Sequence, residues 1–466
     1  MNPLFNPIFT AGLIKRYLTD IDRAWKKNAD EIRKYQNRAL RKTLKYAYNV
    51  PLYRRKYREA GITIDGIKGM DDLHKLPLIT KKDLIEGFPD DIIPVGYDKS
   101  NAYVVGTSGS SGRPMSMYKD VGYIMIEALA GVRLLKAYGM NWRKTKITNI
   151  GDFSIPTTTD EECLKKGLMG NLSPFFSFKN YQNLYTGEDV RTLMDKMDSF
   201  QPELLIGYTS VLMGLASLKM KGHGKRVNPK YIVSSGEVLD DYSRKYIEEA
   251  FDADVLNLYA TTEGGSIAFE CLKGNFHINS DFTHVEILDK NGEEVPEGEF
   301  GSVVITRLYP GGTPIIRYTG LNDIASLKND YCDCGMHTPL MKTLEGRKKD
   351  AIIFPDGRIF PPATIPMPLA EAASKFNTLQ IKRFQLVQKE IDSMEILVEI
   401  DEEQRGKGVS VENLLEEIRK NYEKLVGSGV KIEVREVKEV EKPEGSISPP
   451  LIISKLDRKA IEEALL

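Results

Sequence analysis

The chain has 466 residues, a formal net charge of −1 at pH 7, 41% hydrophobic residues and 28% charged residues. This composition is typical of a globular protein that is long enough for two or more domains. The balanced charge excludes a general electrostatic attraction to nucleic acid or to an anionic membrane. Because the sequence has no run of eighteen apolar residues and no basic-then-apolar secretion signal, we expect a cytoplasmic protein without a transmembrane helix.

The predicted elements of the N-terminal half alternate between helix and strand. Residues 18–48 are rich in Lys, Arg, Ala and Leu and predict a helix. Thr80, followed three residues later by Asp83, predicts the start of another helix through a capping box. Residues 103–118 predict two strands joined by a Ser/Gly-rich loop, and residues 123–138 predict a further helix. This alternation favours an α/β architecture with layered sheets.

The alternation continues through the middle of the chain. Apolar runs at residues 232–233 and 255–259 predict buried strands. Between them, Asp240 or Asp241 predicts the N-cap of a helix that ends near Phe251. The segments that follow these strands carry short polar motifs, and such positions often contribute to a binding site.

The last part of the chain has the pattern of a small separate domain. Strand signals there surround an amphipathic helix that starts at Ser410 and ends at Gly427. The sequence pattern changes from that of the N-terminal part to that of the small domain after the basic segment near Lys349. We therefore predict an α/β fold with a large layered N-terminal domain, residues 1–348, and a small α+β C-terminal domain, residues 349–466.

The loop at residues 107–114 combines hydroxyl groups, glycines and one cation. Its glycines allow a close approach of the backbone to a ligand, and consecutive N–H groups in such a loop bind anions. Because no lysine of the Walker type is present, we predict a phosphate-binding loop of another kind; the alternative is a flexible hairpin turn. The candidate binding residues are Thr107, Ser108, Gly109, Ser110, Ser111, Gly112 and Arg113.

Another group of residues has the composition of a metal site. Two cysteines lie one residue apart, and a further cysteine and a histidine lie six residues apart. Three thiolates and one imidazole form a standard closed zinc site, which is structural because no coordination position stays open. The alternative is reduced cysteines packed in the core; His337 is a second choice of histidine, and Cys163 is left out. The candidate ligands are Cys271, His277, Cys332 and Cys334.

Four motifs in a fixed order resemble the adenylate-forming superfamily of acyl ligases. They are the Ser/Gly-rich loop, Tyr-Ala-Thr-Thr-Glu at 259–263, Arg-Tyr-Thr-Gly-Leu-Asn-Asp at 317–323 and Ser-Lys-Leu-Asp-Arg at 454–458. Within this superfamily the chain is similar to the phenylacetate–coenzyme A ligase group, with its coenzyme-adenylating and capsule-biosynthesis relatives. The resemblance covers nearly the whole chain. It implies an AMP-binding N-terminal domain and a mobile C-terminal domain.

The resemblance implies a nucleotide site with a role for each matched residue. It places Tyr259 beside adenine, Thr262 on the α-phosphate and Glu263 on Mg²⁺, a hard cation that prefers oxygen ligands. Asp323 matches the ribose ligand, although two extra residues precede it, and Arg347 matches a second ribose contact. The segment that lines the adenine pocket corresponds to Ser235, Gly236 and Glu237.

The resemblance also implies an adenylation lysine, a hinge and an acid pocket. Lys455 matches the lysine that contacts the α-phosphate, although the family's glycine before it is missing; the alternative is an ordinary surface lysine. Lys349 matches the hinge about which the small domain rotates between the half-reactions. The acid pocket corresponds to Tyr138, Tyr208, Gly236 and Ala260.

The function implied by the resemblance is an ATP-dependent carboxylic acid–coenzyme A ligase that uses Mg²⁺ and contains structural zinc. It first forms an acyl-adenylate and pyrophosphate, and the thiol of coenzyme A then attacks the adenylate. One alternative keeps adenylation and changes the acceptor to a carrier protein or a coenzyme. Another alternative is a non-catalytic, ligase-like binding protein, suggested by the two extra residues before Asp323 and the missing glycine before Lys455. A homodimer is an expectation from the family.

Overall fold

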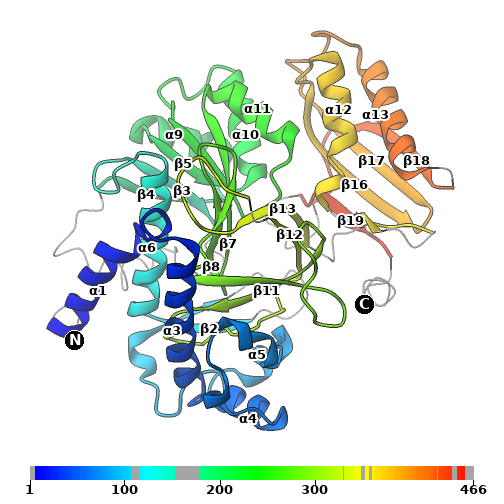
Figure 1. The fold of residues 1–466 in the computed structure, drawn as a ribbon. Coiled ribbons are helices and arrows are strands. Elements are labelled where there is room, and N and C mark those ends of the chain that lie inside the picture. Colours follow the sequence, from blue (N-terminus) through cyan, green and yellow to red (C-terminus); the bar gives the residue numbers. More distant parts are fainter. Residues whose placement is uncertain are drawn as a thin grey trace. The chain divides into compact units, whose positions relative to one another are not determined.

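The computed structural model (Figure 1) describes residues 6–106, 115–152, 179–328, 330–347, 352–355, 359–360, 362–427, 429–442 and 449–456. The chain divides into two compact units: Met1–Tyr185 with Leu256–Thr343, and Thr186–Val255 with Leu344–Leu466. We call them unit 1 and unit 2. In the described ranges, no helix has both the length and the apolar character needed to cross a bilayer. The predicted domain boundary at residues 348 and 349 stays a prediction.

Unit 1 begins with a series of helices. The helix predicted over residues 18–48 is interrupted twice, after α1 and after α2. Asn28 explains the second interruption, because its side chain accepts a hydrogen bond from the backbone N–H of Glu31 at 2.9 Å and so starts α3. The helices are α1 (Pro7–Asp20), α2 (Arg23–Lys26), α3 (Ala29–Ala47), α4 (Pro51–Glu59), α5 (Lys81–Gly87) and α6 (Val121–Ala137), with 3₁₀ turns at Ile64–Gly66, Met70–Lys75 and Lys99–Asn101.

Capping side chains start the next two helices of unit 1. At α5, the backbone N–H of Thr80 donates to the carboxylate of Asp83 at 2.8 Å, and the Thr80 side chain accepts from the N–H of Asp83. The predicted capping box is therefore confirmed. At α6, the Asp120 carboxylate accepts a hydrogen bond from the N–H of Tyr123 at 2.9 Å. The helix predicted over residues 123–138 is present, beginning at Val121.

Most strands of unit 1 are antiparallel. β1 (Ala102–Gly106) and β2 (Ser116–Asp120) form a hairpin, and α6 packs against β2 and β8. β3 (Ile147–Gly151) and β4 (Tyr181–Tyr185) pair in parallel. The other strands follow the hydrogen-bonding order β10-β11-β12-β13-β9-β8-β7; the first two residues of β7 and the last four of β13 are assigned to unit 2. These strands are β7 (Asp254–Thr261), β8 (Gly265–Glu270), β9 (Phe276–Ile278), β10 (Thr283–Leu288), β11 (Gly301–Arg307), β12 (Asp323–Lys328) and β13 (Leu340–Arg347).

The first part of unit 2 alternates helix and strand. β5 and β6 pair in parallel, and α10 packs against α9, α11 and β6. Asp240 caps α11, as the sequence predicts, and its carboxylate accepts from the N–H of Ser243 at 3.0 Å. The elements are α9 (Val190–Phe200), β5 (Leu204–Gly207), α10 (Thr209–Met220), β6 (Tyr231–Ser235) and α11 (Asp241–Phe251).

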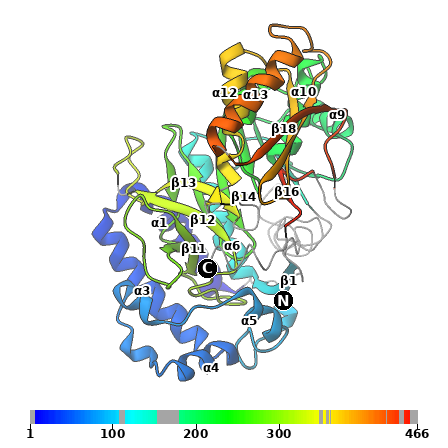
Figure 2. The ribbon, with the colours of Figure 1, turned by 90° about the vertical axis from the view of Figure 1, so that its right-hand side faces the viewer.

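The C-terminal part of unit 2 is a sheet with two helices. The strand order is β18-β17-β16-β19, and α12 and α13 lie side by side against it (Figure 2). Ser410 caps α13, whose apolar face buries Leu414, Ile418 and Tyr422, so the predicted amphipathic helix is confirmed. The elements are β14 (Ile352–Ile353), β15 (Ile359–Phe360), α12 (Met367–Phe376), β16 (Ile381–Glu390), β17 (Ser393–Ile400), α13 (Val411–Val426), β18 (Lys431–Val437) and β19 (Ile452–Ser454), with a 3₁₀ turn at Pro362–Thr364.

Candidate functional site

The predicted phosphate-binding loop, residues 107–114, lies outside the described residues, but the strands on either side of it are described. Gly106 ends β1 and pairs with Ser116 at the start of β2. The hydroxyl of Thr262 donates a hydrogen bond to the carbonyl of Gly106 at 3.5 Å. The structure therefore brings the Thr-Thr-Glu motif to the end of the strand that leads into the Ser/Gly-rich loop.

Glu263 occupies the turn between β7 and β8, and three hydrogen bonds fix the backbone there. The N–H of Gly264 donates to Oγ1 of Thr261 at 2.9 Å, and the hydroxyl of Thr283 donates to the carbonyl of Gly264 at 2.9 Å. The hydroxyl of Tyr123, on α6, donates to the carbonyl of Glu263 at 3.4 Å. The backbone of this turn is thus held by two neighbouring elements.

Two glycines make this tight turn possible. A Cβ at Gly264 would lie 2.7 Å from a side-chain carbon of Ile267. Gly265 has φ = +67°, and a Cβ there would lie 2.8 Å from Oε1 of Glu127. Larger residues would displace these neighbours or strain the backbone. Gly264 and Gly265 therefore allow the tight turn that carries Glu263.

The Glu263 carboxylate is buried, with the residue only 6% exposed. Its Oε1 accepts a hydrogen bond from the hydroxyl of Tyr318 at 3.1 Å. Burial raises the pKa of Glu263, although that hydrogen bond and the charges of Lys81 and Lys119 act in the opposite direction. A buried carboxylate that gains stability from positive charge suits a hard cation with oxygen ligands, such as Mg²⁺.

Two buried cations, on β2 and β11, lie near this turn. The ammonium of Lys119, on β2, pairs with Oε1 of Glu127 at 2.8 Å, and burial lowers its pKa. The guanidinium of Arg307, on β11, lies 3.9 Å from the ring centre of Tyr123 and donates to the carbonyl of Thr313 at 2.6 Å. Sequence reasoning missed both cations, because a single basic residue within a strand forms no motif.

Tyr259 and Asp323 come together in unit 1. The hydroxyl of Tyr259, on β7, donates to Oδ2 of Asp323 at 2.6 Å, and both residues are buried. Asp323 is the first residue of β12, directly after Asn322, whose φ of +59° is left-handed. The two extra residues of the motif therefore form a turn before β12. This pairing of the predicted adenine-side and ribose-side residues has no signal in the sequence.

The predicted adenine-pocket segment lies in unit 2. Oε2 of Glu237 accepts from the N–H of Ser210 at 2.7 Å, and its Oε1 accepts from the Ser210 hydroxyl at 3.0 Å. This carboxylate thus satisfies a backbone donor at the start of α10. Gly236 has φ = +81°, and a Cβ there would lie 2.5 Å from a ring carbon of Tyr208. Tyr208 and Gly236, both predicted for the acid pocket, are therefore neighbours.

The remaining predicted site residues are distributed over both units. Tyr138 is buried in unit 1, where its hydroxyl donates to the carbonyl of Glu270 at 2.9 Å, and Ala260 lies within β7. Arg347 ends β13. Lys455 is an exposed residue of unit 2 that follows β19, and its backbone N–H donates to the carbonyl of Gln388 at 2.9 Å. Lys349, Cys163, Asp457 and Arg458 lie outside the described residues.

The four predicted metal ligands form one cluster in unit 1. Their ligand atoms all lie within 4.8 Å of one another. Sγ of Cys271 is 3.6 Å from Sγ of Cys332, and Sγ of Cys334 is 3.2 Å from Nε2 of His277. Zinc–sulfur bonds of about 2.3 Å in a tetrahedron place two sulfurs about 3.8 Å apart. The cluster therefore has the donor set and the spacing of a tetrahedral zinc site.

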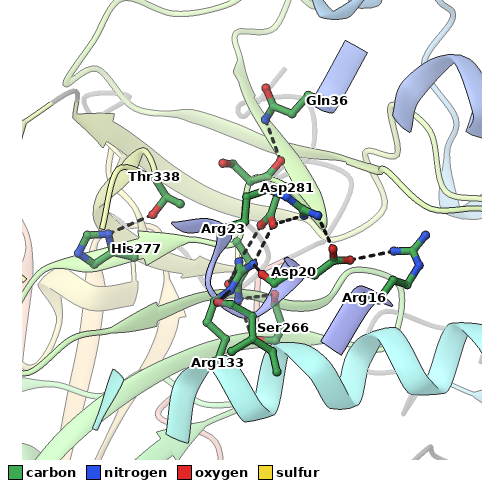
Figure 3. Close-up of polar contacts among 12 residues, drawn as sticks. Arg16, Asp20, Arg23, Gln36, Arg133, Ser266, His277, Asp281 and Thr338 are labelled. Atoms are coloured by element: carbon green, nitrogen blue, oxygen red, sulfur yellow. Dashed lines mark hydrogen bonds and ion pairs between the residues drawn. The ribbon is translucent and has the colours of Figure 1, made fainter. Parts of the chain in front are cut away.

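Neighbouring groups orient these ligands. Nδ1 of His277 lies 3.1 Å from the hydroxyl of Thr338 (Figure 3). Its other ring nitrogen, Nε2, is the one that lies near Sγ of Cys334. Burial, with the charge of Lys328, lowers the pKa of His277 to about 4, so the imidazole is neutral as a metal ligand requires. Gly274 and Gly335 have positive φ within the turns beside the cysteines. His337, the alternative histidine, is exposed and outside the cluster.

A buried ionic network fixes the segment that follows His277 (Figure 3). The guanidinium of Arg133, on α6, pairs with both oxygens of Asp281 at 2.7 and 2.8 Å, and Arg23 pairs with the same carboxylate at 2.6 Å. Arg133 also donates to Oδ1 of Asn279 at 3.0 Å, and Nδ2 of Asn279 donates to the carbonyl of Ser266, on β8, at 3.0 Å. The segment between β9 and β10 is thereby joined to the helices and to β8.

Comparison with known proteins gives matches over most of the chain. No protein-family model matches it. It is 27% identical over 342 residues to the phenylacetate-coenzyme A ligase of Thermus thermophilus, which covers 71% of this chain and 74% of that protein. It is 27% identical over 403 residues to the enzyme of the same name from Escherichia coli K12, with 82% and 86% covered. Over most of its length the chain is similar to phenylacetate–coenzyme A ligases.

A structural match agrees with this relationship. A crystal structure of 2-hydroxyisobutyryl-CoA ligase in complex with 2-HIB-AMP superposes with a TM-score of 0.77, at 21% identity, over 95% of this chain and 93% of that chain. The fold of this chain is thus similar to that of a CoA ligase. It confirms the predicted mixed α/β fold, with a large sheet domain and a smaller C-terminal α+β part. The roles of individual site residues stay predictions.

Proposed function

We propose that this chain is an ATP-dependent carboxylic acid–coenzyme A ligase that acts through an acyl-adenylate and then a thioester. The observation that carries the proposal is the Glu263 turn. It combines a fixed backbone, a buried carboxylate and a neighbouring hydroxyl, that of Thr262, which contacts the strand leading into the Ser/Gly-rich loop. The homologues named phenylacetate-coenzyme A ligase support the same reaction class. Phenylacetate and other aryl acids are therefore the first substrates to test.

The first step joins a carboxylate oxygen to the α-phosphorus of ATP and releases pyrophosphate. Both reactants are anionic, so the site must offset their charge and align them. The hydroxyls, N–H groups and guanidinium of residues 107–113 would bind the phosphates, and Thr262 would contact the α-phosphate. Glu263 would hold Mg²⁺, which supplies positive charge to the phosphate oxygens when bound.

The nucleoside end of ATP would lie against the Tyr259–Asp323 pair. A carboxylate held in one place by a tyrosine hydroxyl is suited to accept hydrogen bonds from the ribose hydroxyls. Arg347 would make a second ribose-side contact, as the resemblance in the sequence implies. Ser235, Gly236 and Glu237 would line the adenine side. These assignments follow the resemblance in the sequence.

In the second step the thiol of coenzyme A would attack the acyl carbon, and AMP would leave. We assign Lys455 to the α-phosphate during the first step, as the resemblance implies, and Lys349 to the hinge between the steps. Lys455 directly follows β19, so strand pairing fixes its backbone within the C-terminal sheet. A lysine with a fixed backbone and an exposed side chain can contact a phosphate in one conformation and withdraw in another.

We also propose that Cys271, His277, Cys332 and Cys334 bind one zinc ion. The donor set, the spacing of the ligand atoms and the contact between Nδ1 of His277 and the Thr338 hydroxyl, to which a zinc-bound imidazole would donate its remaining N–H, support the assignment. Because four protein ligands complete the tetrahedron, this zinc would be structural. It would join the β8–β9 hairpin to the segment before β13.

The experiment that tests the proposal compares Glu263→Gln with Glu270→Gln. Glu270 ends the neighbouring strand, β8, and its carboxylate accepts a hydrogen bond from the N–H of Asn257 at 2.9 Å. We expect Glu263→Gln to lower acid-dependent exchange of pyrophosphate into ATP by roughly a hundredfold, since preorganised electrostatic groups commonly have effects of that size. Glu270→Gln should retain the exchange. Equal exchange rates in both variants would contradict the role of Glu263.

A further inference from the structure

The hydroxyl of Tyr318 contacts the carboxylate on which the proposed function depends. It donates to Oε1 of Glu263 at 3.1 Å, and Tyr318 is completely buried. Among the described residues, no other side chain donates a hydrogen bond to this carboxylate. The ammonium of Lys119, a nearby cation, is engaged with Glu127 instead. A hydrogen bond to an ionised group is strong and directional, so Tyr318 determines how the Glu263 side chain is turned.

Backbone hydrogen bonds fix Tyr318 on two sides. Its N–H donates to the carbonyl of Ile305, on β11, at 2.9 Å, and the N–H of Ile305 returns a bond of 3.1 Å. On the other side, the N–H groups of Thr319 and Ile79 donate to the carbonyls of Ile79 and Arg317, each at 2.9 Å. Tyr318 is therefore held between β11 and the segment that precedes α5.

Other residues of the Arg-Tyr-Thr-Gly motif help to position this tyrosine. A Cβ at Gly320 would collide with the hydroxyl and ring carbons of Tyr318, so only glycine leaves room for the ring. Arg317 has φ = +46°, and its guanidinium pairs with Glu286 at 3.1 Å and donates to the carbonyl of Leu76 at 2.7 Å. The motif thus forms a rigid support for one hydroxyl group.

The two ends of the contact are therefore fixed independently. The backbone of Glu263 is held by bonds to α6 and to the start of β10, and the backbone of Tyr318 is held by β11. Only the side-chain torsions of Glu263 are left to vary, and the Tyr318 hydroxyl restricts them. Groups that hydrogen-bond a metal ligand fix its orientation in this way and tune its affinity for the metal.

We propose that Tyr318 is a positioning residue that holds the Glu263 carboxylate in the orientation in which it binds magnesium–ATP. The inference rests on the proposed function, because it takes Glu263 as the magnesium ligand. Tyr318 touches neither the acid nor the nucleotide in this account and acts through Glu263. An ordinary core tyrosine would instead contribute to stability and leave the magnesium dependence unchanged.

The test replaces Tyr318 by Phe, which keeps the ring and removes the hydroxyl. We expect the half-saturating Mg²⁺ concentration for adenylate formation to rise about tenfold or more, the usual effect of removing a partner of a metal ligand. The KM for the acid should not change, and saturating Mg²⁺ should restore most of the rate. A purely structural tyrosine would change the melting temperature without this dependence on Mg²⁺.

Tyr53→Phe is the matched control. Tyr53 is also completely buried in unit 1, and its hydroxyl donates to the carbonyl of Pro314 at 2.8 Å and accepts from the N–H of Ile316 at 3.2 Å. Its loss therefore disturbs the same segment without touching Glu263. We expect the Mg²⁺ dependence of Tyr53→Phe to equal that of the wild type. An equal shift in both variants would overturn the assignment of Tyr318.

A double-mutant cycle separates action through Glu263 from any other action. Binding of magnesium–ATP, measured by calorimetry, should weaken in Tyr318→Phe and should not weaken further when Tyr318→Phe is added to Glu263→Gln. Additive losses would overturn the inference. Wild-type protein that binds ATP independently of Mg²⁺ would remove both this inference and the proposed function. Wild-type binding that requires Mg²⁺, with an identical requirement in Tyr318→Phe, would remove this inference alone.

Discussion

Asp281 is a buried carboxylate that two guanidinium groups keep ionised. Burial alone would raise its pKa, but the charges and hydrogen bonds of Arg133 and Arg23 outweigh burial and lower the pKa below its ordinary value. A carboxyl group whose pKa is lower in the folded protein contributes stability above its unfolded pKa. That contribution is lost as the pH falls through the unfolded value of about 3.9 and on toward the lower folded pKa.

We therefore predict that Asp281→Asn weakens the protein and flattens its response to acid. The substitution leaves Arg133 buried without its charged partner, which typically costs about 3–5 kcal/mol. The wild-type free energy of unfolding should fall steeply below about pH 4, and that of Asp281→Asn should fall less. Urea unfolding at a series of pH values measures both effects. Parallel pH profiles for the two proteins would contradict the assigned ionisation.

At the scale of residues, the sequence predicts motif members but not the contacts between them. Tyr259 and Asp323 were each assigned by motif, yet their hydrogen bond joins residues 64 positions apart. Tyr318 lay within a named motif without a role, because its partner Glu263 is 55 positions away. Contacts of this kind depend on strand pairing, which short motifs do not encode. The metal cluster is the exception, because its ligands are rare residues with a characteristic spacing.

At the scale of elements, the sequence predicted helix starts correctly where a side chain accepts a hydrogen bond from a nearby backbone N–H. The capping residues Thr80, Asp240 and Ser410 each start a helix, as the sequence predicts. The breaks in the helix predicted over residues 18–48 were harder to predict, because its residues favour helix throughout. Only the cap at Asn28 marks the break before α3. Helix propensity sums over a segment, whereas a cap acts at one position.

The β8–β9 hairpin leads to a prediction about zinc. Purified protein should contain about one zinc per chain, because the four ligand atoms already cluster. Cys332→Ser should lose the metal and lower the melting temperature by about 5 °C or more, as the loss of a few kcal/mol does in a large domain. Cys163→Ser is the control, because this cysteine is left out of the predicted ligand set. Metal-free wild-type protein with an unchanged melting temperature would contradict this assignment.

At the scale of the whole molecule, the sequence predicted the fold class and the reaction class together, because four motifs occurred in one order. The acid pocket is the part of the site that the sequence predicts least well. Its predicted residues come from both units, with Tyr138 and Ala260 in unit 1 and Tyr208 and Gly236 in unit 2. Pocket shape depends on side chains brought together by the complete fold.

The proposed ligase activity is tested by measuring pyrophosphate release from ATP and Mg²⁺ with a panel of aryl, fatty and amino acids, with and without coenzyme A. We predict release that depends on the acid, is strongest with an aryl acid and is accelerated by coenzyme A, with AMP and the acyl thioester as products. Release that depends on the acid but not on coenzyme A would contradict the assigned acceptor. No release with any acid, from protein that binds magnesium–ATP, would contradict the ligase itself.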